Sequence, residues 1–206
     1  VARRITEEVA AGRQAFVVCA AIDAEATGKT ADKDAAGDAP VLEGEQLAIS
    51  TASHIGTDRH ASVVRDILTE GGLTEDALGC PAAWPSDSAT RDELVREHGV
   101  PTRVRMNCSG KHAAMLRACV ATGWPTAGYL DPAHPLQQHI RDVIERLTGE
   151  KIAHTAIDGC GAPVHAMTLT GLARAIHRIG TASDRSPFAL HRVAGGDHVG
   201  FVDQAR

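Results

Sequence analysis

The 206-residue sequence has no run of 18 or more apolar residues, roughly the length that a membrane-spanning helix needs. Its first residues, VARRITEEVAAG, carry charges of both signs and do not lead into the hydrophobic stretch of a signal peptide. Positive charge is also scarce, because the net charge is −5 and the pI is about 6.1. Nucleic-acid binding normally needs a broad positive field. We therefore expect a soluble, cytoplasmic protein with no membrane or nucleic-acid partner.

The sequence also lacks a CxxC pair and an even number of cysteines. An odd number in a chain without secretion features argues against a disulfide framework and for reduced thiols. Each thiol then either binds a metal ion or is buried in the core. The five cysteines are Cys19, Cys80, Cys108, Cys119 and Cys160.

Hydrophobic residues make up 43% of the chain and charged residues 23%, which is typical of one globular domain of α/β character. Residues 23–40 differ, because Ala, Asp, Gly, Lys and Thr dominate there and large apolar side chains are almost missing. Such a segment cannot bury enough surface to offset the entropy lost on ordering. We predict an N-terminal segment with a flexible linker over residues 1–40, separate from the domain that covers residues 41–206.

Apolar periodicity and turn residues predict several helices and strands along the chain. A strand is expected over 14–22, and either a strand or a buried helical turn over 47–51. Further strands are expected over 102–106 and 152–157. Helices are expected over 2–11, 60–70, 87–98, 113–121, 136–148 and 169–179, with a helical turn over 74–77.

Two segments place a cysteine between small residues at the end of a predicted strand: NCSGKH at 107–112 and DGCG at 158–161. Small neighbours allow backbone and ligand to approach closely. Zinc takes thiolate and nitrogen ligands in tetrahedral geometry, so Cys108 and Cys160 are candidate ligands. The alternative is that both thiols are simply buried, as free cysteines often are.

A third zinc ligand would have to come from a residue near Cys108. His112 is the ordinary candidate, because a spacing of four residues puts two side chains on one helical face. Lys111 is the less ordinary one, since an amine must lose its proton before it can bind a metal. A metal ion in a pocket of low dielectric can overcome that cost.

Five strings along the chain, in the same order, resemble those of the bacterial L-asparaginase II family, and the resemblance covers roughly residues 42–195. They are ASH at 52–54, MNCSGKHAAML at 106–116, GWPTAGYLDPAHPLQ at 123–137, DGCGAP at 158–163 and LTGLARA at 169–175. The resemblance implies a partial α/β sandwich related to serine β-lactamases and glutaminases, with a mixed sheet and flanking helices. It also implies a zinc ion, hydrolysis of L-asparagine to L-aspartate and ammonia, and a homodimer.

Carried over to this sequence, the family resemblance assigns a role to each candidate residue. The implied zinc ligands are Cys108, Lys111 and Cys160, which favours the lysine over the histidine. Asp158 would lie beside the metal and accept a hydrogen bond from its water or from the substrate amine. Asn107 and His112 would line the substrate pocket. Ser53 matches a catalytic serine, which would relay a proton or hold the substrate carboxylate; its alternative is a hydroxyl capping a turn.

The sequence departs from the family pattern where the nucleophile is expected. The family has an S-x-x-K pair before the ASH segment, in which the lysine helps to deprotonate the attacking serine. No such pair precedes Ser53, the chain stops at Arg206 without a further lysine of the family, and Ile55 replaces a small polar residue. We expect little or no asparaginase activity from this chain. The alternative is a non-catalytic, zinc-stabilised or ligand-binding domain.

Residues 4–19 resemble a short segment of bacterial branch-migration DNA helicases, which gives a third hypothesis. The acidic charge balance and the missing ATP-binding motif weigh against it. The triplet Gly28-Lys29-Thr30 is not a P-loop, because Asp23 stands where the first glycine should be and no strand leads directly into it.

Overall fold

The computed structural model describes residues 15–17, 42 and 44–181. The helices in this part of the chain are α2 (Gly44–Thr51), α3 (Asp58–Glu70), α4 (Ser88–Arg96), α5 (Ser109–Thr122), α6 (Pro135–Thr148) and α7 (Leu169–Gly180). A 3-10 turn, η1 (Glu75–Ala77), follows α3. The strands are β1 (Ala15–Val17), β2 (His154–Ile157) and β3 (Pro163–Met167). The predicted helix over 2–11 lies outside the described residues.

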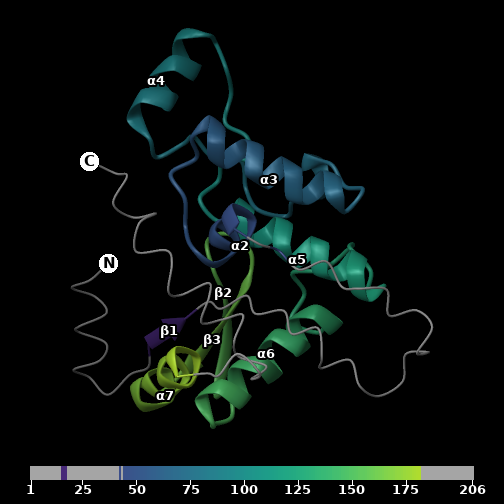
Figure 1. Ribbon diagram of the computed structural model, residues 1–206, viewed down its shortest axis with the longest axis vertical. Helices are drawn as coiled ribbons and strands as arrows, with labels where there is room; N and C mark the ends of the chain where they lie inside the picture. The colour runs from purple at the N-terminus through teal and green to yellow at the C-terminus, as the bar shows by residue number, and fades with distance from the viewer. Residues whose placement is uncertain (1–14, 18–41, 43, 182–206) are drawn as a thin grey trace.

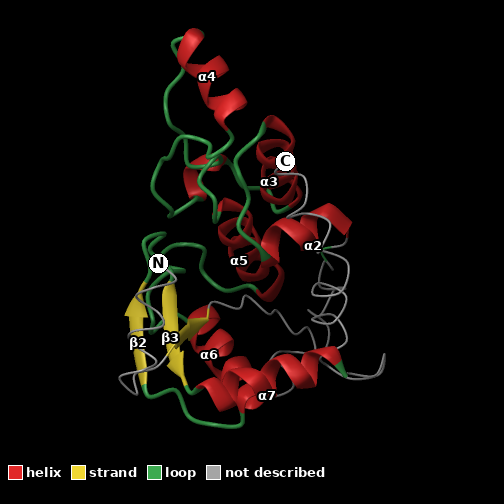
Figure 2. Ribbon diagram, turned by 90° about the vertical axis from the view of Figure 1, so that its left-hand side faces the viewer, coloured by secondary structure: helices red, strands yellow, loops and turns green. Residues whose placement is uncertain are grey.

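The described elements form two halves (Figures 1 and 2). Helices α2, α3 and α5 pack together in one half, and the sheet lies with α6 and α7 in the other. Helix α4 projects from the first half and has no buried residue. Helix α5 also contacts α6, which links the two halves.

Helix α5 is the central helix of the core. Ten of its fourteen residues are buried, so it is covered on nearly all sides and lacks the polar face of a surface helix. Its contact with α2 is close at Gly110, where an added Cβ would lie 2.3 Å from the backbone oxygen of Ile49. A residue without a side chain is therefore required at this position, and the start of α5 is fixed against α2.

The sheet has the order β1-β3-β2, and both pairings are antiparallel. Strands β2 and β3 form a hairpin in which Ile157 pairs with Pro163. The described sheet therefore differs from the expected mixed sheet. For β2 and β3 the reason is the short turn over residues 158–162, because a parallel pair needs a crossover of a dozen or more residues. Strand β3 itself was not predicted.

Most of the predicted helices are confirmed, with ends that capping residues define. Helix α3 begins after Thr57, which forms a capping box with His60. Helix α4 begins after Asp87, whose carboxylate accepts from the Thr90 N–H. Residues 47–51 lie in helix α2, so the helical alternative for that segment is correct.

The predicted strand over residues 102–106 is wrong. Apart from one isolated bridge, this segment consists of turns. Its alternation is real, since the buried Val104 and Met106 alternate with the more exposed Arg103 and Arg105. The two arginines, however, donate to carbonyl groups of neighbouring loops, and the segment forms no ladder with another strand. A buried loop can thus mimic the period of a strand.

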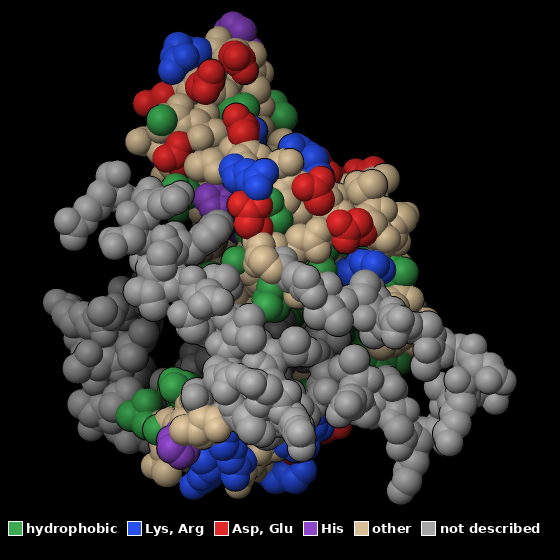
Figure 3. Space-filling model, in the orientation of Figure 1, with side chains coloured by type: hydrophobic (Ala, Val, Ile, Leu, Met, Phe, Trp, Pro, Cys, Tyr) green, Lys and Arg blue, Asp and Glu red, His purple; other side chains and the backbone are tan. Residues whose placement is uncertain are grey.

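Charged side chains are distributed differently over the two halves (Figure 3). Acidic and basic groups are mixed over α3 and α4, whereas basic groups gather around the end of α6 and α7. Two of them, Arg174 and Arg178, donate to the last carbonyl groups of α6. These bonds satisfy acceptors that the helix itself leaves open. None of the described helices combines the length and apolar character needed to cross a membrane.

Candidate functional site

The first candidate cysteine lies at the N-terminus of α5. Cys108 is the N-cap residue, 7% exposed, and its backbone N–H donates to the Met106 sulfur at 3.1 Å. The N-terminus of a helix carries a partial positive charge, which stabilises a thiolate placed there. The close packing at Gly110 fixes this end of the helix.

The second candidate cysteine lies in the tight turn of the β2–β3 hairpin. The Asp158 N–H donates to the Ala162 carbonyl, and the Gly161 N–H donates to the Asp158 carbonyl, both at 2.9 Å. Gly161 has a φ of +89°, a conformation that favours glycine. This turn buries the Cys160 side chain, which is 2% exposed.

The fold brings the two thiols into direct contact. The hydrogen bond from Cys160 lowers the pKa of Cys108 to about 6, although burial opposes this change. The same bond, together with burial, raises the pKa of Cys160 to about 12. In the metal-free chain the pair therefore shares one proton at neutral pH, with Cys108 as thiolate and Cys160 as thiol.

Two charged residues flank the thiol pair. Lys111, three residues after Cys108 in the first turn of α5, is 7% exposed, and its charge lowers the pKa of the Cys108 thiol. The Asp158 carboxylate raises that pKa and lies 3.6 Å from the Cys160 sulfur. Asp158 is exposed, so its carboxylate is accessible from solvent.

The Ala52–His54 motif follows α2 and contacts the same site. The Ser53 side chain hydrogen-bonds the Cys108 sulfur, and Ser53 is exposed. The next residue ties the motif to α5, because the His54 backbone N–H donates to the Asn107 carbonyl at 3.0 Å. Ser53, Asp158 and Asn107 are therefore the exposed members of the site.

His54 stabilises this arrangement and was not singled out from the sequence. Its Nδ1 accepts from the Gly56 N–H at 3.2 Å, and its Nε2 lies 2.9 Å from Ser109 Oγ. Because the Ser109 hydroxyl donates to the Val104 carbonyl, it accepts from His54 Nε2–H. Burial, with a smaller effect of His60, lowers the pKa of His54 to about 4, so the ring is neutral at pH 7.

His112 lies on the buried side of the thiols. Its ring is fully buried, and Nδ1 is 2.6 Å from the Tyr129 hydroxyl. Its Nε2 has no hydrogen bond of good geometry to any described residue, but the ring is close enough to Cys160 to lower the pKa of that thiol. This position favours support of Cys160 over direct substrate contact. Tyr129 was not predicted as a site residue, since only its presence in the string at 123–137 pointed to it.

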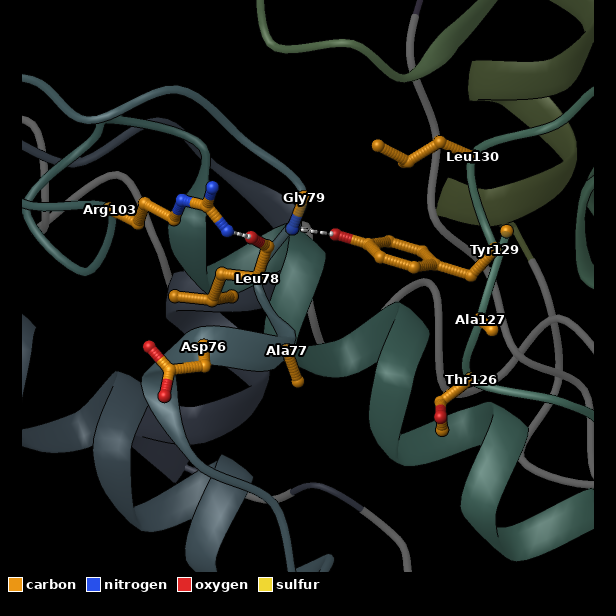
Figure 4. A pocket seen from close by; sticks show the side chains of 10 residues that line it. Asp76, Ala77, Leu78, Gly79, Arg103, Thr126, Ala127, Tyr129 and Leu130 are labelled. Carbon is orange, nitrogen blue, oxygen red and sulfur yellow. Dashed lines mark hydrogen bonds between the residues drawn. The ribbon is translucent and has the colours of Figure 1, made fainter.

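A cavity of about 400 Å³ opens on the other side of Tyr129 (Figure 4). The Tyr129 hydroxyl accepts from the Gly79 N–H at 2.8 Å, and Arg103 donates to the Leu78 carbonyl at 2.6 Å. Asp76 is also among the residues that line this cavity. The phenol thus lies between this cavity and the ring of His112.

All seven predicted site residues lie at or next to the thiol pair. The two cysteines, Lys111, Asp158, Ser53 and His112 interact within it, and Asn107 directly precedes Cys108. The donor set fits a zinc ion, since it combines two thiols in contact with each other and a buried lysine whose charge acts on Cys108. Within the described residues no group of three or more His, Cys, Asp or Glu is arranged to hold a metal. The predicted ligand set is not such a group, because its third ligand is a lysine. Zinc binding stays a prediction.

The chain also matches a known protein family. The family model described as L-asparaginase II matches residues 29–196, most of the chain. The match begins inside the segment that we expected to be a linker outside the family. The domain is therefore of the asparaginase-like hydrolase class. The chain belongs to the L-asparaginase II family. No curated protein shows significant similarity to it.

Proposed function

We propose that the domain binds L-asparagine at a zinc site formed by Cys108, Lys111 and Cys160. The observation that carries the proposal is the contact between two thiols that are far apart in the sequence, one of them lowered in pKa to about 6. Family membership supports an amide substrate. When bound, zinc would polarise the amide carbonyl as a Lewis acid.

The exposed side of the site supplies groups for an amino-acid substrate. The Asp158 carboxylate can accept a hydrogen bond from the substrate ammonium group, and the Asn107 amide can donate or accept. The Ser53 hydroxyl, beside the Cys108 sulfur, can donate to the substrate carboxylate or transfer a proton.

We further propose that this polypeptide by itself hydrolyses asparagine poorly. No S-x-x-K pair precedes Ser53 in the sequence, and a polarised amide without an activated nucleophile is bound but not attacked. Ammonia release from L-asparagine by the purified chain measures this directly. Robust release would overturn this part of the proposal and leave the binding site in place.

Zinc analysis tests the metal site. We expect about one zinc ion per wild-type chain and a large loss in Cys108→Ala and Cys160→Ala, because each variant removes one of three ligands. Cys119→Ala is the matched control, since Cys119 is also buried in α5 but takes no part in the thiol pair. Equal zinc content in all four proteins would remove the site.

Calorimetric titration with L-asparagine tests the substrate. Asp158→Asn should weaken binding, because it removes the charge that faces the ammonium group. Asp142→Asn is the control, since Asp142 is an exposed carboxylate on α6. Equal affinities in the two variants would argue against the role of Asp158.

A further inference from the structure

We propose that Tyr129 is a positioning residue that acts on Cys160 through His112. The Tyr129 hydroxyl holds the imidazole so that its Nε2–H faces the Cys160 sulfur. Three groups form this chain of contacts: the Gly79 N–H, the Tyr129 hydroxyl and the His112 ring. The phenol oxygen lies 2.8 Å from the Gly79 nitrogen and 2.6 Å from His112 Nδ1. The rings of His112 and Tyr129 meet edge to face, with centroids 5.7 Å apart.

The direction of these hydrogen bonds follows from the donors present. A backbone N–H can only donate, so the phenol oxygen accepts from Gly79 and its own proton remains available. Burial raises the pKa of Tyr129, which keeps that proton on the phenol. If His112 Nδ1 donated instead, the buried hydroxyl proton would have no hydrogen-bond acceptor among the described residues, so the hydroxyl donates to His112 Nδ1. A neutral imidazole that accepts at Nδ1 carries its hydrogen on Nε2.

The phenol is itself held from two sides. Its residue is 4% exposed, and the buried Gln137 side chain donates to the Tyr129 backbone carbonyl at 2.7 Å. The Gly79 N–H fixes the other end of the side chain. Tyr129 therefore has one defined position, and the imidazole orientation that depends on it is defined too.

The function of this chain of contacts is to supply a hydrogen bond to sulfur. His112 Nε2 is buried and has no other partner among the described residues, and an N–H left in that state is costly. An Nε2–H directed at the Cys160 sulfur, the group with which this ring interacts, reduces that cost and helps to orient the sulfur. The step from the oriented sulfur to zinc rests on the proposed function, whereas the imidazole arrangement does not.

Nitrogen NMR of the full metal-free chain tests the arrangement. His112→Gln identifies the His112 signals by their disappearance, and we expect those signals to show the hydrogen on Nε2. Tyr129→Phe, which keeps the ring and removes the hydroxyl, should abolish this preference. Gln137→Leu is the matched control, because it also deletes one hydrogen bond to Tyr129 but leaves the hydroxyl, so the Nε2–H form should persist. A hydrogen on Nδ1 in the wild type would overturn the proposal even if Tyr129→Phe did not fold.

Competition titration with zinc alone measures the consequence. Groups that orient a metal ligand typically contribute about 10- to 100-fold to affinity, so Tyr129→Phe should weaken zinc binding by that order. In a His112→Gln background the same substitution should not weaken zinc binding further, because the side chain through which Tyr129 acts is absent. An equal loss in both backgrounds would show that Tyr129 does not act through His112. If the wild type bound no zinc, the proposed metal site would fail, and the tautomer alone would decide this inference.

Discussion

Gly110→Ala provides the sharpest test of how the thiol site is built. The added Cβ would lie 2.3 Å from the Ile49 backbone oxygen and 2.8 Å from its carbonyl carbon. The first distance is about 1 Å shorter than the 3.4 Å at which ordinary contact begins. Since the neighbour is backbone, no change of rotamer can relieve the clash, and α2 and α5 must separate.

The expected cost follows from two opposing effects. Overpacking a core costs about 1–3 kcal/mol, and a clash between a side chain and backbone belongs at the upper end. Alanine in a helix gains about 1 kcal/mol over glycine, which offsets part of that cost. We therefore expect Gly110→Ala to lower the free energy of unfolding by about 2 kcal/mol, measured by urea denaturation.

The matched control is Gly171→Ala, a second glycine in the first turn of a helix. Its Cβ would meet the end of the Glu150 side chain at 2.6 Å, which can move aside. We expect a change below about 1 kcal/mol there, since the loss is confined to surface hydrogen bonds. Gly110→Ala should also alter the reactivity of Cys108, because the shifted helix end holds that thiol. Wild-type stability in Gly110→Ala would refute the close packing of α2 and α5.

Two further predictions concern titration. The pKa of His54 is lowered from 6.5 to about 4, so between these pH values the unfolded chain binds more protons than the folded chain. The free energy of unfolding therefore falls as the pH drops through this window. The decrease due to His54 is about 3 kcal/mol. Urea midpoints at several pH values should show a weaker pH dependence in His54→Gln, and identical slopes would contradict the assignment. In the metal-free chain at pH 7, iodoacetamide should modify Cys108 first among the four described cysteines, since the pKa values of Cys80, Cys119 and Cys160 are raised to about 11, 11 and 12. Peptide mass spectrometry identifies the modified residue, and faster alkylation of Cys119 would contradict this order of thiol acidity.

The sequence predicted the helices better than the sheet, for a physical reason. Helices α3 and α6 carry an apolar stripe with capping residues at their ends, and both signals are local. Strand β3 is short and buried, and its pairing depends on a turn whose geometry is set by Gly161. The false strand over residues 102–106 shows the converse, since alternating burial arises there from loop packing.

The residues of the candidate site could be named from the sequence, but the residues that support them could not. Cysteines between small residues are visible in the sequence, whereas the roles of His54 and Tyr129 depend on contacts across 50 or more residues. A lone buried histidine or tyrosine carries no sequence signal that separates support of a site from ordinary core packing.

The positions of the family strings explain why they belong together. Four of the five converge on the thiol pair: ASH supplies Ser53, the start of α5 supplies Cys108, the α5–α6 loop supplies Tyr129, and the β2–β3 turn supplies Cys160. The fifth, LTGLARA, lies in α7 and packs on α6. Helix α6 in turn provides Gln137, which holds the Tyr129 carbonyl. The string farthest from the sulfurs is therefore connected to them through α6 and the Tyr129 loop, and loosening α7 should disturb Cys160 before it disturbs Ser53.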